Sequence, residues 1–482
     1  MAGVTGIGSG IDIESIVSSM VAAERAPKQT QLANLEKKTT TQITAVGALK
    51  SAINDFQTAL GSLNKADLFQ ARSATSSKMD LVGVTASTTA GVGSYQVEVK
   101  SLATNSKVAL AAIENTAETP AAFSSGTLNI SLGVPGTPPS KDTFSVTVDE
   151  SNNSLAGVRD AINEAGKDMG VSATIVTDEF GSRLVLTSSK TGAGRDITVG
   201  VTDEAALQTG QTSLSALAFD GATSNTGAGA RVLSSAQSAE LYIDGLKVIS
   251  ETNKVEGAID GVTLDLKAKT VANEPLTVSV AEDKAGVNKQ VQSFVDAYNK
   301  LIGVINAQTK VTSVGDGKAP VTGALVGDAT ARTLLGTIRS ELVNTQGDGA
   351  IRALTDMGIT TQKDGTLAID STKLDKTLAG NFDQLSGFFT GDNGLAARLD
   401  AKLKPYTETG GILEQRNKAM TETITKIDDQ KENLNRRITA LQERLYKQFN
   451  AMDLLVGQLS NTSSSLIASL ENLPWAASNS KK

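Results

Sequence analysis

The sequence predicts an α+β multidomain protein in which helices from the two ends of the chain pair as coiled coils. A mixed, helix-rich leg domain and two inserted, mainly β head domains complete the predicted fold. Three observations support it. Heptad patterns occupy both ends, strand-like alternation fills the middle, and 482 residues exceed the ~250–300 that one hydrophobic core can hold.

The N-terminal region has the pattern of a short helix followed by a longer one. Asp12 is a suitable N-cap, and Pro27 is expected to stop or kink the first helix. The longer helix has a positions at Leu32, Thr39, Val46, Ile53 and Leu60 and d positions at Leu35, Gln42, Leu49, Phe56 and Leu63. Alanines recur at its g position, which favours either close helix approach or simply helix formation. We expect an assembly interface here to contain Ile13, Ile16, Val17, Met20, Val46, Leu49, Ile53, Phe56 and Leu60.

The middle of the chain alternates as β-strands do. Apolar and polar residues alternate at 128–132 and 144–148, and Ser154 can cap a short helix. Hairpins are predicted around Gly181 and around Asp244-Gly245, because Asp-Gly suits a type I′ turn. Most of 193–231 is poor in apolar residues, with 197–201 the main exception, and is expected to be loop or weak strand on an exposed surface.

Helical periodicity returns after the β region. Helices are predicted over 287–305, from Asp328 onward, and from a Ser371 cap through Phe389, with a short strand before Ser371. A Gly410-Gly411 break then precedes the C-terminal heptads.

The C-terminal heptads predict one continuous helix over 413–459, about 70 Å long. Its a/d stripe is narrow and needs a partner helix, which is the other end of this chain or the same segment of another copy. Lys431 and Gln448 interrupt the stripe, which sets register or marks weak packing. The candidate assembly residues of this helix are Ile424, Ile427, Leu434, Ile438, Leu441, Leu445, Phe449, Met452, Leu455 and Leu459.

Four domains are predicted, each built from one or two stretches of the chain. They are a terminal coiled-coil domain (1–42 and 430–482), a leg domain (43–79 and 283–429), an inner β head domain (80–110 and 231–282) and an outer β head domain (111–230).

The composition excludes most catalytic chemistry. The chain has no cysteine and no histidine, so thiol nucleophiles, histidine bases and zinc cages are absent. No phosphate-binding loop occurs, and we predict no enzyme and no catalytic, cofactor-binding or metal-binding residues. A net charge of −7 gives no reason to expect nucleic acid as a partner. Neither a Sec-type signal peptide nor a membrane span is expected. Trp475 is either a partner anchor or an ordinary tail residue.

Seven stretches, in order, carry a resemblance to a known family. They are GSGIDIESIVSSMVAAERAP, GSYQVEVKSLATNSKV, AINEAGKDMGVSATIV with SRLVLTSSKTGAGRDITV, SFVDAYNKLIGVI, GALVGDATARTLL, MGITTQKDGTLAIDSTKL and RLYKQFNAMDLLVGQL. The chain resembles the flagellar hook-associated protein 2 family, which caps the flagellar filament. The third stretch is similar to a repeat of flagellin-related export proteins.

The resemblance implies a structural role at the distal tip of the bacterial flagellum, outside the cell. Its implied partners are further copies of itself in a ring, flagellin, hook–filament junction proteins and a type III export chaperone at the C-terminal helix. Export through the flagellar type III apparatus, without a cleaved signal, is also implied. We further expect the imperfect terminal heptads to form contacts that break and re-form as subunits are added.

Three other functions are weighed against capping. A hook–filament junction protein shares the terminal helices but should lack SFVDAYNKL and DGTLAIDSTKL. A surface adhesin would bind host mucin or glycans through the head domains. A carboxylate-dependent hydrolase would degrade cell wall, which an assay of the purified protein tests.

Overall fold

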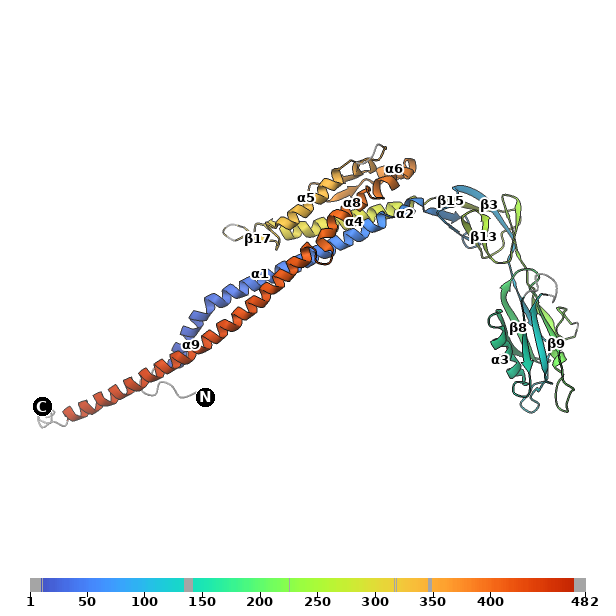
Figure 1. The fold of residues 1–482 in the computed structure, drawn as a ribbon, viewed down its shortest axis with the longest axis horizontal. Coiled ribbons are helices and arrows are strands. Elements are labelled where there is room, and N and C mark those ends of the chain that lie inside the picture. The colour runs from blue at the N-terminus through green and yellow to red at the C-terminus, as the bar shows by residue number, and fades with distance from the viewer. Residues whose placement is uncertain are drawn as a thin grey trace. The chain divides into compact units, whose positions relative to one another are not determined.

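The computed structural model describes residues 10, 12–133, 142–224, 226–315, 317, 319–345 and 349–471. The chain forms two compact units (Figure 1), unit 1 from Met1–Ala66 with Lys284–Lys482 and unit 2 from Asp67–Asp283. The predicted α+β multidomain fold with paired terminal helices is confirmed. The boundaries of the four predicted domains stay a prediction.

Unit 1 is mainly helical. Long α1 and α9 extend from a bundle of shorter helices that also carries two small hairpins (Figure 1). Its elements are α1 (Ile13–Leu63), α4 (Lys284–Thr309), β16 (Val311–Thr312), β17 (Val321–Thr322), α5 (Ala329–Val343), β18 (Ile359–Thr361), β19 (Leu367–Ile369), α6 (Ser371–Gly380), α7 (Phe382–Phe389), α8 (Leu395–Thr407) and α9 (Ile412–Glu471).

Helix α1 begins as predicted but does not end at its proline. The Asp12 carboxylate accepts a hydrogen bond from the Ser15 amide at 3.0 Å. The expected separation into two helices at Pro27 is wrong, since α1 continues through this residue to Leu63. A proline inside a helix loses one backbone hydrogen bond. Val17 before Pro27 and Leu32 after it are both buried against α9. This packing on both sides keeps α1 helical through the proline.

The single helix predicted from Ser371 to Phe389 is also wrong, because it consists of two helices. The cap of α6 is Asp370, whose carboxylate accepts from the Lys373 amide at 3.1 Å. Helix α6 ends at Gly380, and Asn381 separates it from α7. The apolar spacing runs on across Asn381, so the sequence pattern hides this break.

Unit 2 contains antiparallel β-sheets. A five-stranded sheet in the order β1-β15-β3-β11-β12 and a three-stranded sheet β13-β14-β2 enclose one core. A four-stranded sheet β10-β4-β8-β7, a three-stranded sheet β6-β5-β9 and α3 enclose a second core. The strands are β1 (Arg72–Ser76), β2 (Val82–Ala86), β3 (Gly93–Ser101), β4 (Asn105–Ala109), β5 (Gly126–Leu132), β6 (Asp142–Val148), β7 (Val171–Asp178), β8 (Gly181–Thr191), β9 (Ile197–Thr202), β10 (Arg231–Ser234), β11 (Ala239–Ile243), β12 (Leu246–Ser250), β13 (Lys254–Ile259), β14 (Val262–Leu266) and β15 (Leu276–Glu282). Helix α3 spans Leu155–Gly166, and a short α2 (Ala66–Gln70) bridges the two units in sequence.

Both predicted hairpins are present. Strands β7 and β8 pair around Gly181, and β11 and β12 pair around Asp244 and Gly245. The latter two residues have φ of 50° and 82°, as a type I′ turn requires.

A carboxylate organises the segment that follows β9. Glu204 accepts hydrogen bonds from the hydroxyls of Ser215, of Ser124 at 2.7 Å and of Ser213 at 2.7 Å. These hydroxyls, that of Ser215 foremost, hold the pKa of Glu204 at about 2. The ionised carboxylate therefore ties three separate positions of the second core together.

Candidate assembly interface

The two terminal helices form an antiparallel pair within one chain. Near the start of α1, Ile13 and Val17 share an apolar cluster with Leu445 of α9. Further along α1, Leu32 packs in a second cluster, whose α9 members are earlier in sequence: Ile427, Leu434 and Ile438, with Ile424 and Leu441 partly buried beside them. Of the two partners that the heptads allow, α1 of the same chain covers this part of α9.

Polar contacts cross the pair between and beside these clusters. Lys431 Nζ lies 2.6 Å from a carboxylate oxygen of Glu36, and this hydrogen bond raises the pKa of Lys431. Arg437 and Glu24 approach to 3.6 Å, and Arg25 donates to Asn435. The polar interruption that Lys431 makes in the heptads is therefore satisfied across the pair. The further along α1 a residue lies, the earlier its partner lies in α9: Glu24 pairs with Arg437 and Glu36 with Lys431. Together the contacts therefore favour one antiparallel register.

Two further polar or exposed positions distinguish the α1 stripe from an ideal seam. Thr39 is buried, and its hydroxyl donates to the carbonyl of Leu35 at 2.8 Å, so it leaves no unpaired group. Leu35 occupies a predicted d position but is 43% exposed. A straight helix drifts relative to a strict heptad repeat, which takes some nominal d positions out of the seam.

The later part of α1 lies in the core of the leg. Val46, Leu49, Ile53, Phe56 and Leu60 are all fully buried. The Phe56 ring centroid lies 5.6 Å from that of Phe294 and 5.8 Å from that of Tyr298, both on α4. These five predicted interface residues thus pack α1 into the core of its own unit, and their role in assembly stays a prediction. The alanines Ala45 and Ala52 are buried on the same helix, as close helix approach requires.

An ion pair fastens the start of α9 to the leg. Arg416 of α9 bonds the carboxylate of Asp328, which also accepts from the Ala331 amide at 3.0 Å as the N-cap of α5. The bond to Arg416 keeps the pKa of Asp328 below its ordinary value. The predicted start of a helix at Asp328 is confirmed, and the same residue anchors α9.

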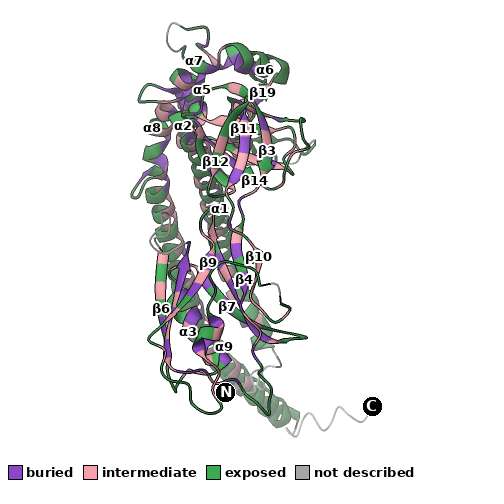
Figure 2. Cartoon of the chain, turned by 90° about the vertical axis from the view of Figure 1, so that its right-hand side faces the viewer, coloured by how far each residue is buried: buried purple, intermediate pink, exposed green. Residues whose placement is uncertain are grey.

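Beyond Leu445, α9 continues past the start of α1 (Figure 1). Phe449 is partly buried, but the apolar residues that follow lie in the open, and the far end of α9 is coloured as exposed in Figure 2. We call this segment, Met452–Leu470, the overhang. Its apolar stripe is Met452 (44% exposed), Leu455 (60%), Leu459 (69%), Leu466 (59%), Ile467 (54%) and Leu470 (53%).

The sequence reasoning missed the last three residues of this stripe. The heptads break at the polar run 461–465, so the sequence pattern predicts no interface residue after Leu459. The helix nevertheless extends to Glu471. Leu466 lies seven residues, or two helical turns, after Leu459, and spacings of four and three then lead from Leu466 and Ile467 to Leu470. Ile16 is partly buried and Met20 is 46% exposed. The assembly role of all these residues stays a prediction, and Trp475 lies outside the described residues.

The described residues contain no candidate metal site. Among them, no group of three or more acidic side chains is arranged to hold a metal ion. Within the same part of the chain, no helix has the length and apolar character needed to cross a membrane.

Comparison with known proteins gives a consistent result along the chain. Two family models, the flagellar hook-associated protein 2 N-terminus and C-terminus, match residues 9–106 and 236–461, and the flagellin hook IN motif matches 127–190. The chain is 50% identical over 481 residues to the B-type flagellar hook-associated protein 2 of Pseudomonas aeruginosa PAO1, covering 99% of each chain. It is 33% identical over 475 residues to flagellar hook-associated protein 2 of Escherichia coli K12, covering 97% of each.

A solved structure agrees in fold. The crystal structure of the D1-D2-D3 domains of the flagellar cap protein FliD from Escherichia coli superposes with a TM-score of 0.59 at 30% identity, covering 78% of this chain and 99% of that one. The match at 127–190 agrees with the predicted likeness of this region to flagellin-related proteins. Sequence similarity over nearly the full length, family models at both ends and the shared fold lead to one conclusion: the chain belongs to the flagellar hook-associated protein 2 family.

Proposed function

We propose that this protein caps the growing end of a bacterial flagellar filament, where it retains exported flagellin and promotes its folding and polymerisation. The observation that carries the proposal is the overhang, a helical apolar stripe presented beside a closed helix pair in a member of this family. The role is structural, with no reaction to catalyse.

The overhang suits association of several copies. From Met452 to Leu470 it extends about 27 Å, at about 1.5 Å per residue. Full burial of one large apolar side chain contributes about 1.5–3 kcal/mol, so six of them supply a substantial driving force. We infer that overhangs of neighbouring copies bury one another in a homo-oligomeric ring, and that the ring also meets flagellin and the hook–filament junction proteins.

The same stripe needs cover before assembly. An exposed apolar helix face invites aggregation, so we infer that a type III export chaperone binds this part of α9 until export. The protein then reaches the flagellum tip outside the cell through the flagellar export apparatus, without a cleaved signal.

Polar residues in the helix pair suit repeated rearrangement. The two apolar clusters share only the partly buried Val21 and Leu441, and charged and amide side chains, including Arg25, Asn435 and Arg437, make further contacts across the pair beside them. Exposed ion pairs of this kind contribute only ~0–1 kcal/mol each. We infer that the pair can open cluster by cluster as the cap moves, rather than as one unit.

A gene deletion tests the cap function. Cells that lack the gene should lose flagellin as monomer into the medium and carry hooks without filaments. Normal filaments in these cells would overturn the proposal.

Two complementing variants then test the overhang itself. Leu459 lies on the stripe and is 69% exposed, whereas Leu454 is 68% exposed and faces the opposite side of α9. Leu459→Asp should fail to restore filaments, and Leu454→Asp should restore them. Since neither side chain is buried in the single chain, both variants should fold equally well, and equal complementation by both would refute the role of the stripe.

Adhesion through the β domains is the second candidate, and it stays a prediction. Binding of the full-length protein to immobilised mucin tests it, with a preparation heated to unfold unit 2 as the control.

A further inference from the structure

Several strand edges in this protein are closed by single side chains. The amide of Asn163 accepts from the backbone N–H of Ala173 at 2.7 Å and donates to its carbonyl at 3.0 Å, which covers the outer edge of β7. Asn299 of α4 makes the same pair of bonds to Leu367 of β19, at 2.7 and 2.8 Å. An asparagine amide here replaces one residue of a neighbouring strand. Such closure matters because an open edge pairs readily with other chains.

Strand β12 is one of the two edge strands of the five-stranded sheet, opposite β1, and lacks this closure. Within its hairpin, backbone bonds alternate between the two sides of each strand. The Asp244 amide donates to the Gln96 carbonyl of β3 at 2.9 Å. The backbone N–H and C=O of Tyr242, two residues earlier, therefore also point toward β3 and away from β12. The cross-strand partner of Tyr242 is Lys247, which therefore directs its N–H and C=O out of the sheet, as does Ile249. Within the described part of the chain, no bond to another element reaches these groups.

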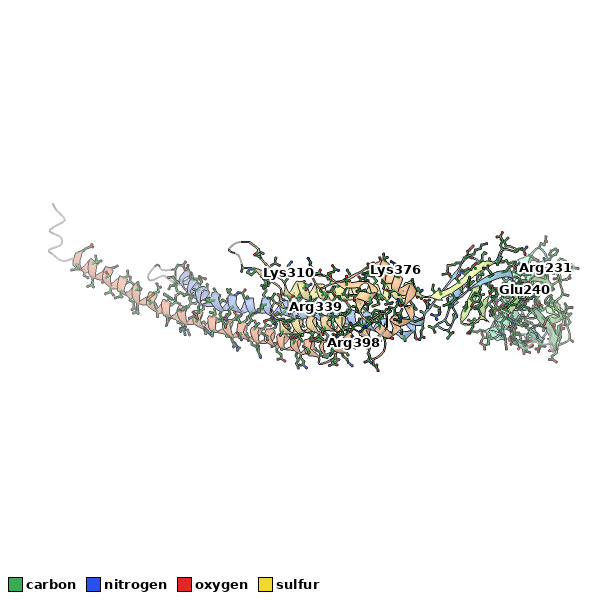
Figure 3. The ribbon with its side chains drawn as sticks, turned by 90° about the horizontal axis from the view of Figure 1, so that it is seen from above. Arg231, Glu240, Lys310, Arg339, Lys376 and Arg398 are labelled. Carbon is green, nitrogen blue, oxygen red and sulfur yellow. The ribbon has the colours of Figure 1, made fainter. Side chains whose placement is uncertain are left out.

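The side chains of β12 also leave this edge accessible to another strand. Leu246 is 73% exposed on the core-facing side of the sheet, and Ile249 is 64% exposed on the other. The single charge, that of Lys247, is paired at 2.9 Å with Glu240, which Figure 3 labels. The edge is thus apolar and electrically balanced. By contrast, β13 at the edge of the facing sheet carries Lys254 and Glu256 and a bulge, features that discourage pairing.

We propose that β12 is a docking strand for an extended polypeptide segment, which adds to the five-stranded sheet as a sixth strand. Free donors and acceptors at Lys247 and Ile249 pair with any extended backbone, while Leu246 and Ile249 contact apolar side chains at alternating positions. The balanced charge selects a neutral, apolar segment. This inference rests on the proposed function, since a protein that retains exported flagellin meets that subunit before it has folded.

The test uses the full-length protein and a defined probe. The probe is a fluorescein-labelled peptide of eight alternating valine and threonine residues, flanked by one lysine and one glutamate so that the peptide segment is neutral, and its binding is followed by fluorescence anisotropy. A second probe carries N-methyl groups on all backbone nitrogens of this segment, so neither of its edges donates to the ladder. We expect the first probe to bind wild-type protein and the second to bind at least about tenfold more weakly. Equal binding of the two probes, or no binding of the first, overturns the proposal.

Variants at one position separate the backbone from the side chain. Ile249→Pro removes an N–H that the β11–β12 ladder does not use, so an edge strand tolerates it. Ile249→Thr keeps that N–H and serves as the matched control. Binding should fall about tenfold or more for the proline variant and stay within about threefold for threonine. If the proline variant fails to fold, Ile249→Lys replaces it in the test. This variant adds a charge at the edge and should also weaken binding.

The outcomes distinguish the docking strand from other readings. If wild-type protein self-associates in sedimentation velocity and Ile249→Pro does not, β12 pairs with a second copy and the proposal is wrong. If the peptide does not bind but the deletion strain loses flagellin, only the docking-strand proposal is refuted. Peptide binding together with normal filaments in that strain removes only the cap function.

Discussion

Leu32→Ala tests the terminal helix pair in solution. Leu32 is 1% exposed and lies in the cluster with Ile427, Leu434 and Ile438. The substitution removes three carbon atoms from this cluster, at about 0.8 kcal/mol each. A two-helix contact can relax around the vacated space, so little is added for a cavity, and we expect the seam to lose about 2–3 kcal/mol.

Hydrogen exchange on the full-length protein measures this loss. Amides of α9 between Ile427 and Ile438 should exchange about 30 to 140 times faster in the variant, because each 1.4 kcal/mol corresponds to tenfold. Leu35→Ala is the matched control on the same helix, since Leu35 is 43% exposed and outside the cluster. Its effect should stay below about 1 kcal/mol, or about fivefold.

Two results would refute the reasoning. Unchanged exchange in Leu32→Ala would mean that the pair is not closed at this point. Protection that disappears on dilution of the wild type would mean that the partner helix comes from another copy, because pairing within one chain does not depend on concentration.

Three further predictions concern other parts of the molecule. Lys431→Leu combined with Gln448→Leu removes both polar interruptions of the C-terminal heptads; we expect slower filament growth, and an unchanged growth rate would contradict the reversible seam. The pKa of Glu204 is about 2, below the ordinary 4.5. Its contribution to stability is therefore complete above about pH 4.5 and is lost as the pH falls toward 2, so the thermal midpoint of Glu204→Gln should vary less than that of wild type over this range. Asn163→Ala exposes both backbone groups of Ala173 and should cost about 1–3 kcal/mol in urea unfolding, with faster exchange of that amide; equal stability would show that water replaces the asparagine.

Local signals in the sequence predicted local structure well. The caps at Asp12, Ser154 and Asp328 are all present, since a cap depends on a side chain and an amide two or three residues away. The Asp244-Gly245 turn has the expected positive φ values for the same reason. In each case the determining atoms lie within a few residues of one another.

The errors arose where distant packing decides the local structure. Helix α1 passes through Pro27 because α9 holds both sides of it, and neither side reveals this in sequence. The asparagine closures were not predicted at all. Asn163 and Ala173 are ten residues apart, and Asn299 and Leu367 sixty-eight, so no sequence spacing links them.

The candidate site shows the same limit. The heptads indicated which α1 residues are buried but not what buries them. Phe56 and Leu60 proved to be core residues of the leg, whereas Ile13 and Val17 contact α9. A heptad pattern specifies an apolar face, and the partner of that face follows only from the positions of all helices.

The length of the overhang is itself set by the helix pair. Helix α1 starts at Ile13, which meets α9 at Leu445, while α9 runs on to Glu471. A slip of the pair by one heptad would lengthen or shorten the overhang by about 10 Å. It would also part Lys431 from Glu36, a bond of 2.6 Å. A weak ion pair adds little to stability, yet a wrong register would leave its charges against apolar side chains. The polar residues that interrupt the seam therefore determine how much apolar helix extends beyond the pair.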